Sequence, residues 1–252
     1  MIKFTSEDIF LVTGSSSGIG KSVALKLNEL GSKVIAVSRS PEALKVLQNT
    51  SAYPHNFFFE IINLSSEIEK LSERVLELSS RYGRLRGIVL SAGEQQILPL
   101  RSLTPKKAKE LFDINYFANI ALCKGFCDRR AHREKDSSVV FISSIASVTG
   151  NAGIINYSAS KGAINSAVKA LAVELAKDNI RVNAVLPGFV KTGIIDKWRD
   201  IYTHEYLEQL EKEYPLGIGQ PEYVADLVVF LLSDCSRWIT GGNIIIDGGA
   251  SL

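Results

Sequence analysis

The sequence predicts an α/β fold, namely a doubly wound, mostly parallel sheet of about seven strands with helices on both faces. Three observations support this prediction. Short apolar runs alternate with amphipathic helical patterns, and a glycine-rich segment directly follows the first apolar run. The 252 residues, 46% of them hydrophobic, are enough for one sizeable core. We therefore expect residues 1–252 to form a single domain.

Each predicted strand is short and mostly apolar, as expected for a strand that is covered on both faces. In chain order the strands are 9–12, 33–37, 57–62, 87–90, 138–142, 180–186 and 243–246. A helix that ends at Gly31 follows the glycine-rich segment. Further helical patterns cover 67–82, 105–127, 155–177 and 221–232. This alternation indicates βαβ units and hence a parallel sheet.

Composition excludes several classes of function. The formal net charge of +2 gives no reason to expect nucleic-acid or anionic-membrane binding. Residues 1–8 lack the apolar stretch of a secretory signal, and the longest apolar run, 227–232, is too short to span a bilayer. We expect a cytoplasmic protein. Cys123 and Cys127, with His132 nearby, are interpreted as structural residues and not as a metal site, because nothing completes a tetrahedral set.

The segment 13–20 reads Thr-Gly-Ser-Ser-Ser-Gly-Ile-Gly and lies between an apolar run and an amphipathic helix. Glycines let the backbone approach a pyrophosphate, and a helix N-terminus offers free N–H groups. The spacing is G-x-x-x-G-x-G, but the strand–turn–helix context still indicates a Rossmann-type dinucleotide site. The contacts predicted from this turn are Gly14, Ser16, Ser17, Gly18, Ile19 and Gly20.

Ser38 and Arg39 follow the second predicted strand. In a dinucleotide fold this strand tip faces the adenine ribose, where an acidic side chain binds the 2′-OH of NAD. An arginine fork suits a 2′-phosphate instead, whereas a carboxylate would repel it. The sequence therefore indicates NADP(H) as the preferred cofactor, bound by Ser38 and Arg39, with NAD(H) as the alternative.

Tyr157 and Lys161 lie four residues apart in the helical pattern 155–177, so their side chains share one helix face. A phenol ordinarily has a pKa of about 10. An adjacent ammonium stabilises the phenolate and lowers that pKa, so the pair can exchange a proton with a substrate at neutral pH. Such a pair is common by chance, and its position downstream of the glycine-rich turn gives it weight.

With these motifs, essentially the whole chain resembles the short-chain dehydrogenase/reductase family, in its single-domain branch. The segment 13–20 is similar to that family's cofactor turn, and Ser144 precedes Tyr157 by 13 residues, as the family's catalytic serine does. Further matches are Asn115 with the helix asparagine, Pro187-Gly188 with the segment beside the nicotinamide, and 239–242 with 247–249 as the C-terminal signature.

The resemblance implies hydride transfer between NADP(H) and a ketone or secondary alcohol. Tyr157 would be the general acid in carbonyl reduction or the base in alcohol oxidation, and Lys161 would bond the nicotinamide ribose. Ser144 would hydrogen-bond the substrate oxygen, and Asn115 would hold a water that links Lys161 to solvent. The remaining implied cofactor contacts are Asn63, Leu64, Ala92, Gly93, Pro187, Gly188, Val190 and Thr192.

The chain departs from the family pattern in two places. Family members usually carry Asn-Asn-Ala-Gly after the fourth strand, whereas residues 90–93 are Leu-Ser-Ala-Gly. The missing asparagines put the tethering of that strand in question more than the chemistry. Asn63 replaces an aspartate that commonly touches adenine, and its amide can still hydrogen-bond.

Substrate choice in this fold comes from the segment after Gly188. Apolar side chains recur there at helical spacing, which predicts a mobile pair of helices that covers the site, a lid at 189–215. Core packing or an oligomer contact explains the same stripe equally well. The stripe consists of Ile194, Ile195, Trp198, Ile201, Tyr202, Tyr206, Leu207 and Leu210.

Within the family, the segments 157–163 and 187–192 are most similar to beta-ketoacyl carrier-protein reductases, which dock an acidic carrier protein on basic residues near the site. Arg129 and Arg130 are candidates for that surface. Asp178, however, stands where those reductases tend to place an arginine. The expected substrate is therefore a small carbonyl or alcohol, either free or linked to a carrier protein.

Two other functions stay open. The first is an NAD-dependent dehydrogenase of a small alcohol, sugar or polyol, which equal or better activity with NADH would reveal. The second is a non-catalytic NADP-binding regulatory module, against which the presence of all four expected catalytic residues argues. The resemblance also implies a homo-oligomer, a tetramer or dimer, built on the helices 105–127 and 155–177 and the last strand.

Overall fold

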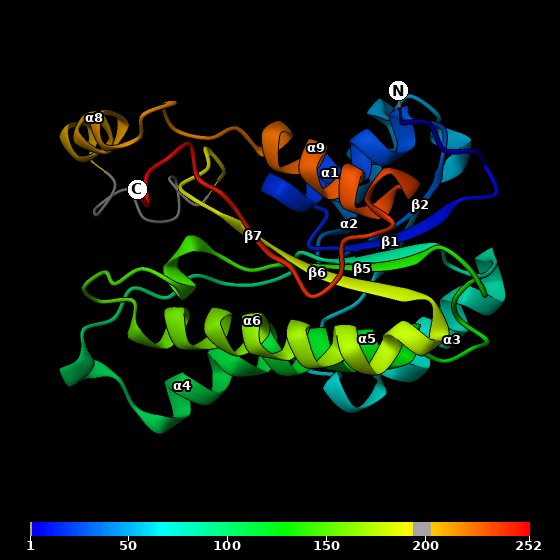
Figure 1. The fold of residues 1–252 in the computed structure, drawn as a ribbon, viewed down its shortest axis with the longest axis horizontal. Coiled ribbons are helices and arrows are strands. Elements are labelled where there is room, and N and C mark those ends of the chain that lie inside the picture. The colour runs from blue at the N-terminus through cyan, green and yellow to red at the C-terminus, as the bar shows by residue number, and fades with distance from the viewer. Residues whose placement is uncertain (1, 194–202) are drawn as a thin grey trace.

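The computed structural model describes residues 2–193 and 203–252, and in it seven parallel strands form one sheet between two layers of helices (Figure 1). The strand order is β3-β2-β1-β4-β5-β6-β7, so the direction of winding reverses between β1 and β4. The strands are β1 (Ile9–Thr13), β2 (Lys33–Ser38), β3 (Phe57–Ile61), β4 (Gly87–Leu90), β5 (Ser137–Ile142), β6 (Ile180–Pro187) and β7 (Asn243–Ile246). This confirms the predicted fold class.

The helices cover both faces of the sheet, with α1, α2 and α9 on one side and α3, α5 and α6 on the other (Figure 1). Their bounds are α1 (Gly18–Glu29), α2 (Pro41–Thr50), α3 (Leu71–Tyr82), α4 (Pro105–Phe112), α5 (Ala118–Phe126), α6 (Ile155–Leu175), α8 (His204–Glu213) and α9 (Pro221–Leu232). None of the helices within the described ranges is long and apolar enough to cross a membrane.

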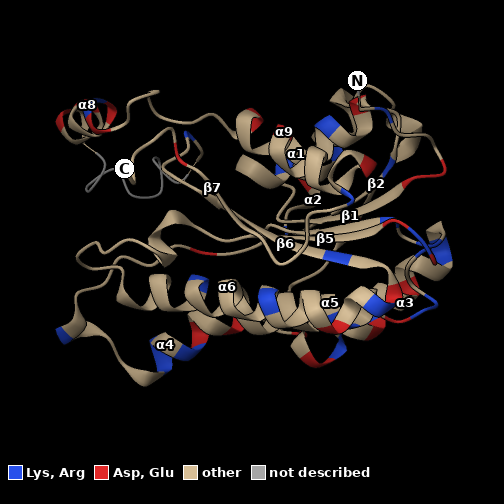
Figure 2. Ribbon diagram, viewed as in Figure 1, with Lys and Arg blue, Asp and Glu red and all other residues tan. Residues whose placement is uncertain are grey.

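Strand β1 shows why continuous apolar runs produce this layered arrangement. Successive side chains of a strand point to opposite faces of the sheet. Ile9 and Leu11 accordingly pack into the core on the side of α3, α5 and α6, whereas Phe10 and Val12 pack into the core below α1 and α9. Both cores bury their residues almost completely, and Figure 2 shows few charged residues within the strands.

Two helices differ from the expectation. The predicted helix 105–127 is α4 and α5 joined by a π-helical segment, Asp113–Phe117, which carries a fully buried Asn115. Helix α2 was not predicted at all, because it buries only Leu44 and Leu47. Its start has a local signal nevertheless, since the Ser40 hydroxyl accepts a hydrogen bond from the Ala43 N–H at 3.4 Å and Pro41 follows that cap.

Candidate active site

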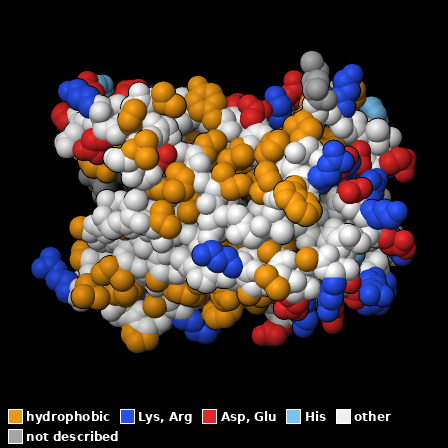
Figure 3. All heavy atoms as spheres, in the orientation of Figure 1, with side chains coloured by type: hydrophobic (Ala, Val, Ile, Leu, Met, Phe, Trp, Pro, Cys, Tyr) orange, Lys and Arg blue, Asp and Glu red, His pale blue; other side chains and the backbone are white. Residues whose placement is uncertain are grey.

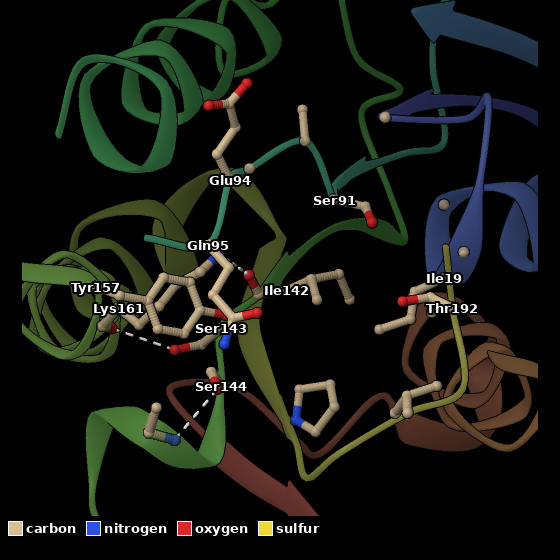
Figure 4. A pocket seen from close by; sticks show the side chains of 18 of the residues that line it. Ile19, Ser91, Glu94, Gln95, Ile142, Ser143, Ser144, Tyr157, Lys161 and Thr192 are labelled. Atoms are coloured by element: carbon tan, nitrogen blue, oxygen red, sulfur yellow. Dashed lines mark hydrogen bonds between the residues drawn. The ribbon is translucent and has the colours of Figure 1, made fainter. Parts of the chain in front are cut away.

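A cavity of about 820 Å³ lies at the carboxyl ends of the strands, around the point where the strand order reverses (Figure 4). Its walls come from the turn after β1, the ends of β2, β4, β5 and β6, the start of α6, and α8. Every predicted site residue lines it except Asn63 and Asn115. The predicted residues in its walls are Gly14, Ser16, Ser17, Gly18, Ile19, Gly20, Ser38, Arg39, Leu64, Ala92, Gly93, Ser144, Tyr157, Lys161, Pro187, Gly188, Val190 and Thr192.

The glycine-rich turn brings backbone against backbone. Gly14 and Gly18 have φ angles of +68° and +53°, a region that side chains with a Cβ rarely adopt. A Cβ on Gly20 would lie 2.5 Å from the Gly14 carbonyl oxygen, and one on Gly14 would lie 3.0 Å from the Ala92 backbone. The turn therefore leaves a surface without side chains at the N-terminus of α1, which fits the pyrophosphate of a dinucleotide.

Thr13 tethers the chain after β4, where residues 90 and 91 lack the asparagines of the family pattern. Its hydroxyl oxygen accepts hydrogen bonds from the Ser91 and Ala92 N–H groups, both at 3.1 Å. On the other side of the same segment, the Asn119 amide donates to the Ala92 carbonyl at 3.3 Å. The chain after β4 is thus fixed to both β1 and α5, although residues 90 and 91 depart from the family pattern.

Tyr157 and Lys161 lie on the first turns of α6, as the sequence predicts. The Lys161 ammonium nitrogen is 5.9 Å from the centroid of the Tyr157 ring and donates to the Ile142 carbonyl at 2.9 Å. The side chain is nearly inaccessible, and this burial lowers the pKa of Lys161 from 10.5 to about 8. Figure 4 shows both residues on the side of the cavity opposite Ile19 and Thr192.

The end of β5 positions Ser144 in the cavity. The neighbouring Ser143 hydroxyl donates to the Asn165 carboxamide oxygen at 2.7 Å, which fixes the strand end to α6. The Ser144 hydroxyl oxygen accepts from the Ala146 N–H at 3.2 Å. Because this bond uses the oxygen as an acceptor, the hydroxyl proton can be donated into the cavity.

Asn115 lies behind the cavity wall and holds the segment that follows β4. Its carboxamide oxygen accepts from the Glu94 N–H at 2.8 Å, and its amide donates to the Glu94 carbonyl at 2.9 Å and to the Ser160 hydroxyl at 3.0 Å. A Cβ on Gly93 would lie 2.9 Å from that carboxamide oxygen and 3.2 Å from the Lys161 nitrogen. Asn115 is therefore close to Lys161, and its role in holding a water stays a prediction.

Three residues that the sequence connects with the site lie elsewhere. The Asn63 carboxamide oxygen accepts from the N–H and the hydroxyl of Ser65, at 3.3 and 2.9 Å, in a local turn. Arg129 pairs with Asp178 at 3.4 Å, just beyond the end of α6, about 30 Å along that helix from Tyr157. Arg130 pairs with Asp128 at 2.7 Å. The expectation that both arginines lie near the site is therefore wrong for a single chain.

Residues that the sequence interpretation did not assign also line the cavity. Glu94 and Gln95 directly follow Gly93. The feature of the sequence that could have indicated them is the presence of two polar residues immediately after Ala92 and Gly93. Tyr214 also lines the cavity, and its hydroxyl oxygen accepts a hydrogen bond from the Phe189 N–H at 2.8 Å.

Helix α8 contributes Tyr206 and Leu210 of the predicted lid to the cavity wall. Leu207 lies on the same helix but not among the lining residues. The other members of the predicted stripe, Ile194, Ile195, Trp198, Ile201 and Tyr202, fall outside the described residues.

The cysteines belong to no cluster of potential metal ligands among the residues that the structure describes. Cys123 is buried, and a hydrogen bond with Cys127 raises the pKa of its thiol. The His132 ring packs against Phe126, with ring centroids 5.8 Å apart. Within residues 2–193 and 203–252, no group of three or more His, Cys, Asp or Glu side chains could hold a metal ion.

The sheet order, the glycine turn and the Tyr–Lys pair together define a dinucleotide-dependent oxidoreductase. A family profile described as enoyl-(acyl carrier protein) reductase matches residues 14–251. The chain belongs to the short-chain dehydrogenase/reductase family, and its members use a nicotinamide cofactor to act on CH–OH or C=O groups. The resemblance seen in the sequence is thereby confirmed.

Related sequences and structures extend over nearly the whole chain. A 3-oxoacyl-(acyl-carrier-protein) reductase of Rickettsia typhi is 35% identical over 251 residues, covering 99% of this chain and 98% of the relative. One from Thermotoga maritima is 32% identical and covers 96% of each chain. A short-chain dehydrogenase/reductase structure from Mycobacterium ulcerans has a TM-score of 0.89 and 29% identity, covering 99% of this chain and 91% of that one.

Gly20→Ala is expected to weaken binding of the nicotinamide cofactor by at least about tenfold, because the added Cβ would press on the Gly14 carbonyl and open the turn. Gly150→Ala is the matched control, since a Cβ there meets nothing within 4 Å and the residue does not line the cavity. A fluorescence titration with NADPH measures both. Equal affinity of Gly20→Ala and the wild type would contradict the assignment of this turn to the cofactor.

Proposed function

We propose that the chain is an NADP(H)-dependent ketoreductase with Tyr157 as its general acid, and that its substrate is a 3-oxoacyl thioester. The observation that carries this proposal is the shared cavity. Tyr157, Lys161 and Ser144 line one part of it, while the glycine turn and Arg39 line another. A dinucleotide held by the turn therefore extends toward the groups that exchange a proton.

The proposed chemistry divides the work between cofactor and protein. The nicotinamide, when bound, supplies the hydride that reduces the carbonyl carbon. Tyr157 donates its phenolic proton to the carbonyl oxygen, and Ser144 donates a hydrogen bond to that oxygen as negative charge develops on it. The Lys161 ammonium stabilises the phenolate that remains on Tyr157. Reversal of these steps oxidises an alcohol, with Tyr157 as the base.

Arg39 supports the preference for NADP(H). Its side chain lines the cavity just after β2 and is 66% exposed, so the guanidinium can reach a 2′-phosphate. We expect Arg39→Gln to weaken NADPH binding by about tenfold or more and to change NADH binding by less than about twofold, because only NADPH carries that phosphate. Fluorescence titration measures both dissociation constants. Arg84→Gln, which removes an exposed arginine outside the cavity, is the control. Wild-type protein that binds NADH as tightly as NADPH would contradict this preference.

The thioester substrate is supported by the names of the relatives and by the cavity wall. Relatives at 30–36% identity are 3-oxoacyl-(acyl-carrier-protein) reductases. Apolar side chains also line the cavity, including Ile97, Ile154 and Leu210. They suit an acyl chain. Tyr206 and Leu210 of α8, which belong to the proposed lid, also line this cavity.

A substrate panel tests the proposal. Purified protein is assayed for NADPH oxidation with acetoacetyl-CoA, the same acyl group on an acyl carrier protein, crotonyl-CoA and free ketones. We expect turnover of the 3-oxoacyl thioesters, with a lower KM for the carrier-linked form. Turnover of crotonyl-CoA alone would indicate enoyl reduction, the activity in the matching profile's description. Better turnover of a small alcohol with NAD would indicate a dehydrogenase, and NADPH binding without any turnover would indicate a regulatory module.

A homo-oligomer is part of the proposal. Figure 3 shows hydrophobic side chains over α9, β7 and the lower helical layer on one face of the molecule. Trp238 and Val173 are 97% and 82% exposed, and apolar side chains that gather on one exposed face indicate an interaction surface. Light scattering after gel filtration measures the assembly, and a monomer would contradict this part.

A further inference from the structure

Arg39 and Glu94 lie side by side in the wall of the cavity. Arg39 follows β2 and Glu94 lies four residues after β4, and both of these strands pair with β1. The two side chains therefore come from opposite sides of the glycine turn. One guanidinium nitrogen of Arg39 lies 3.4 Å from a Glu94 carboxylate oxygen, and both residues line the cavity. In Figure 4 the Glu94 side chain points away from Tyr157 and Ser144.

The backbone of Glu94 is fixed, whereas its ion pair is loose. Asn115, which is fully buried, bonds both the N–H and the carbonyl of Glu94. The carboxylate therefore stays on this side of the cavity. The pair with Arg39 has one long contact between side chains that are 66% and 43% exposed. Such a pair contributes little to orienting the guanidinium.

We propose that Glu94 is a specificity-determining residue of the cofactor site, which limits the preference for NADP(H) over NAD(H). This inference rests on the proposed function, because it needs a 2′-phosphate at Arg39. The phosphate must compete with the Glu94 carboxylate for the same guanidinium. The phosphate must also lie near the negative charge of the Glu94 carboxylate, which repels it. NADH has no 2′-phosphate and therefore does not experience this repulsion.

The loose geometry decides the sign of the effect. If Glu94 mainly oriented Arg39, its removal would weaken NADPH binding. Because the contact is single, long and exposed, the Glu94 carboxylate contributes little to orienting the Arg39 guanidinium. Its removal, by contrast, abolishes both the competition for the guanidinium and the repulsion of the 2′-phosphate. Removal of the carboxylate is therefore expected to tighten NADPH binding.

The test compares Glu94→Gln and Glu94→Ala with the wild type in fluorescence titrations with NADPH and NADH. Both variants keep the backbone bonds to Asn115. We expect NADPH to bind about three- to tenfold more tightly and NADH affinity to change by less than about twofold. The gain should shrink toward about twofold or less at 0.5 M salt, because salt screens exposed charges. Glu77→Gln is the matched control, since Glu77 also pairs with an exposed arginine but does not line the cavity.

The outcomes separate this inference from the function on which it rests. Arg39→Gln is titrated in parallel. If it leaves NADPH affinity unchanged, the 2′-phosphate does not bind at Arg39, and both the proposed cofactor preference and this inference are overturned. If Arg39→Gln weakens NADPH binding but the Glu94 variants bind NADPH equally or more weakly, this inference alone is overturned. Weaker NADH binding in the Glu94 variants would likewise overturn it, because the carboxylate would then bind the ribose.

Discussion

Tyr157→Phe is expected to lower kcat by about a hundredfold to ten-thousandfold while NADPH affinity stays within about twofold of wild type. A positioned general acid contributes about 10²- to 10⁴-fold to a rate. The phenylalanine ring fills the same space in the cavity wall but has no proton to donate. Because the glycine turn and Arg39 are the proposed contacts for the other parts of the dinucleotide, the loss should fall on turnover and not on cofactor binding.

Steady-state NADPH oxidation and a fluorescence titration on the same preparation check this expectation. Tyr223→Phe is the matched control, since Tyr223 is 59% exposed and does not line the cavity. A Tyr157→Phe variant that keeps a tenth of the wild-type rate would show that another group donates the proton. The Ser144 hydroxyl would then be the first candidate, because it lines the same cavity.

The fold could be predicted because buried parallel strands leave a strong mark on the sequence. Strands β4 and β7 have the predicted bounds, and the others differ by one residue at one end. Helix α2 could not be predicted from periodicity, since only Leu44 and Leu47 face the core. The π-helical segment was equally inaccessible, because it depends on the buried bonds that Asn115 makes with the chain after β4.

The residues that line the cavity were predictable where their position depends on local sequence. The glycine turn and the pair Tyr157 and Lys161 are set by spacing along one turn and one helix, so the cavity contains them as expected. Contacts between distant segments were not predictable. The pairing of Arg129 with Asp178, far from the cavity, could not be deduced from spacing along the sequence. The approach of Glu94 to Arg39 depends on the order of the strands in the sheet. Charge partners therefore had to come from the structure.

Lys161→Met is expected to lower kcat/KM by at least about a hundredfold, because the ammonium that we propose to stabilise the Tyr157 phenolate is lost. The same substitution should change how stability depends on pH. Burial lowers the pKa of Lys161 to about 8 in the folded protein, against 10.5 for the unperturbed group. Between these two values the unfolded chain binds more protons than the folded one, so the wild type gains stability as pH rises.

The methionine variant lacks that gain. Its stability relative to the wild type should therefore be highest below pH 8 and should fall by an amount on the order of 3 kcal/mol by about pH 10.5. The variant lacks the hydrogen bond from Lys161 to the Ile142 carbonyl at every pH. This loss changes the stability difference between the two proteins by a constant amount and does not change how that difference depends on pH. Urea unfolding of both proteins without cofactor at pH 7.5 and pH 10 measures the slope, with the exposed Lys169→Met as control. A difference independent of pH would mean that Lys161 keeps an ordinary pKa in the fold, and the buried charge could not then be what prepares the site for proton transfer.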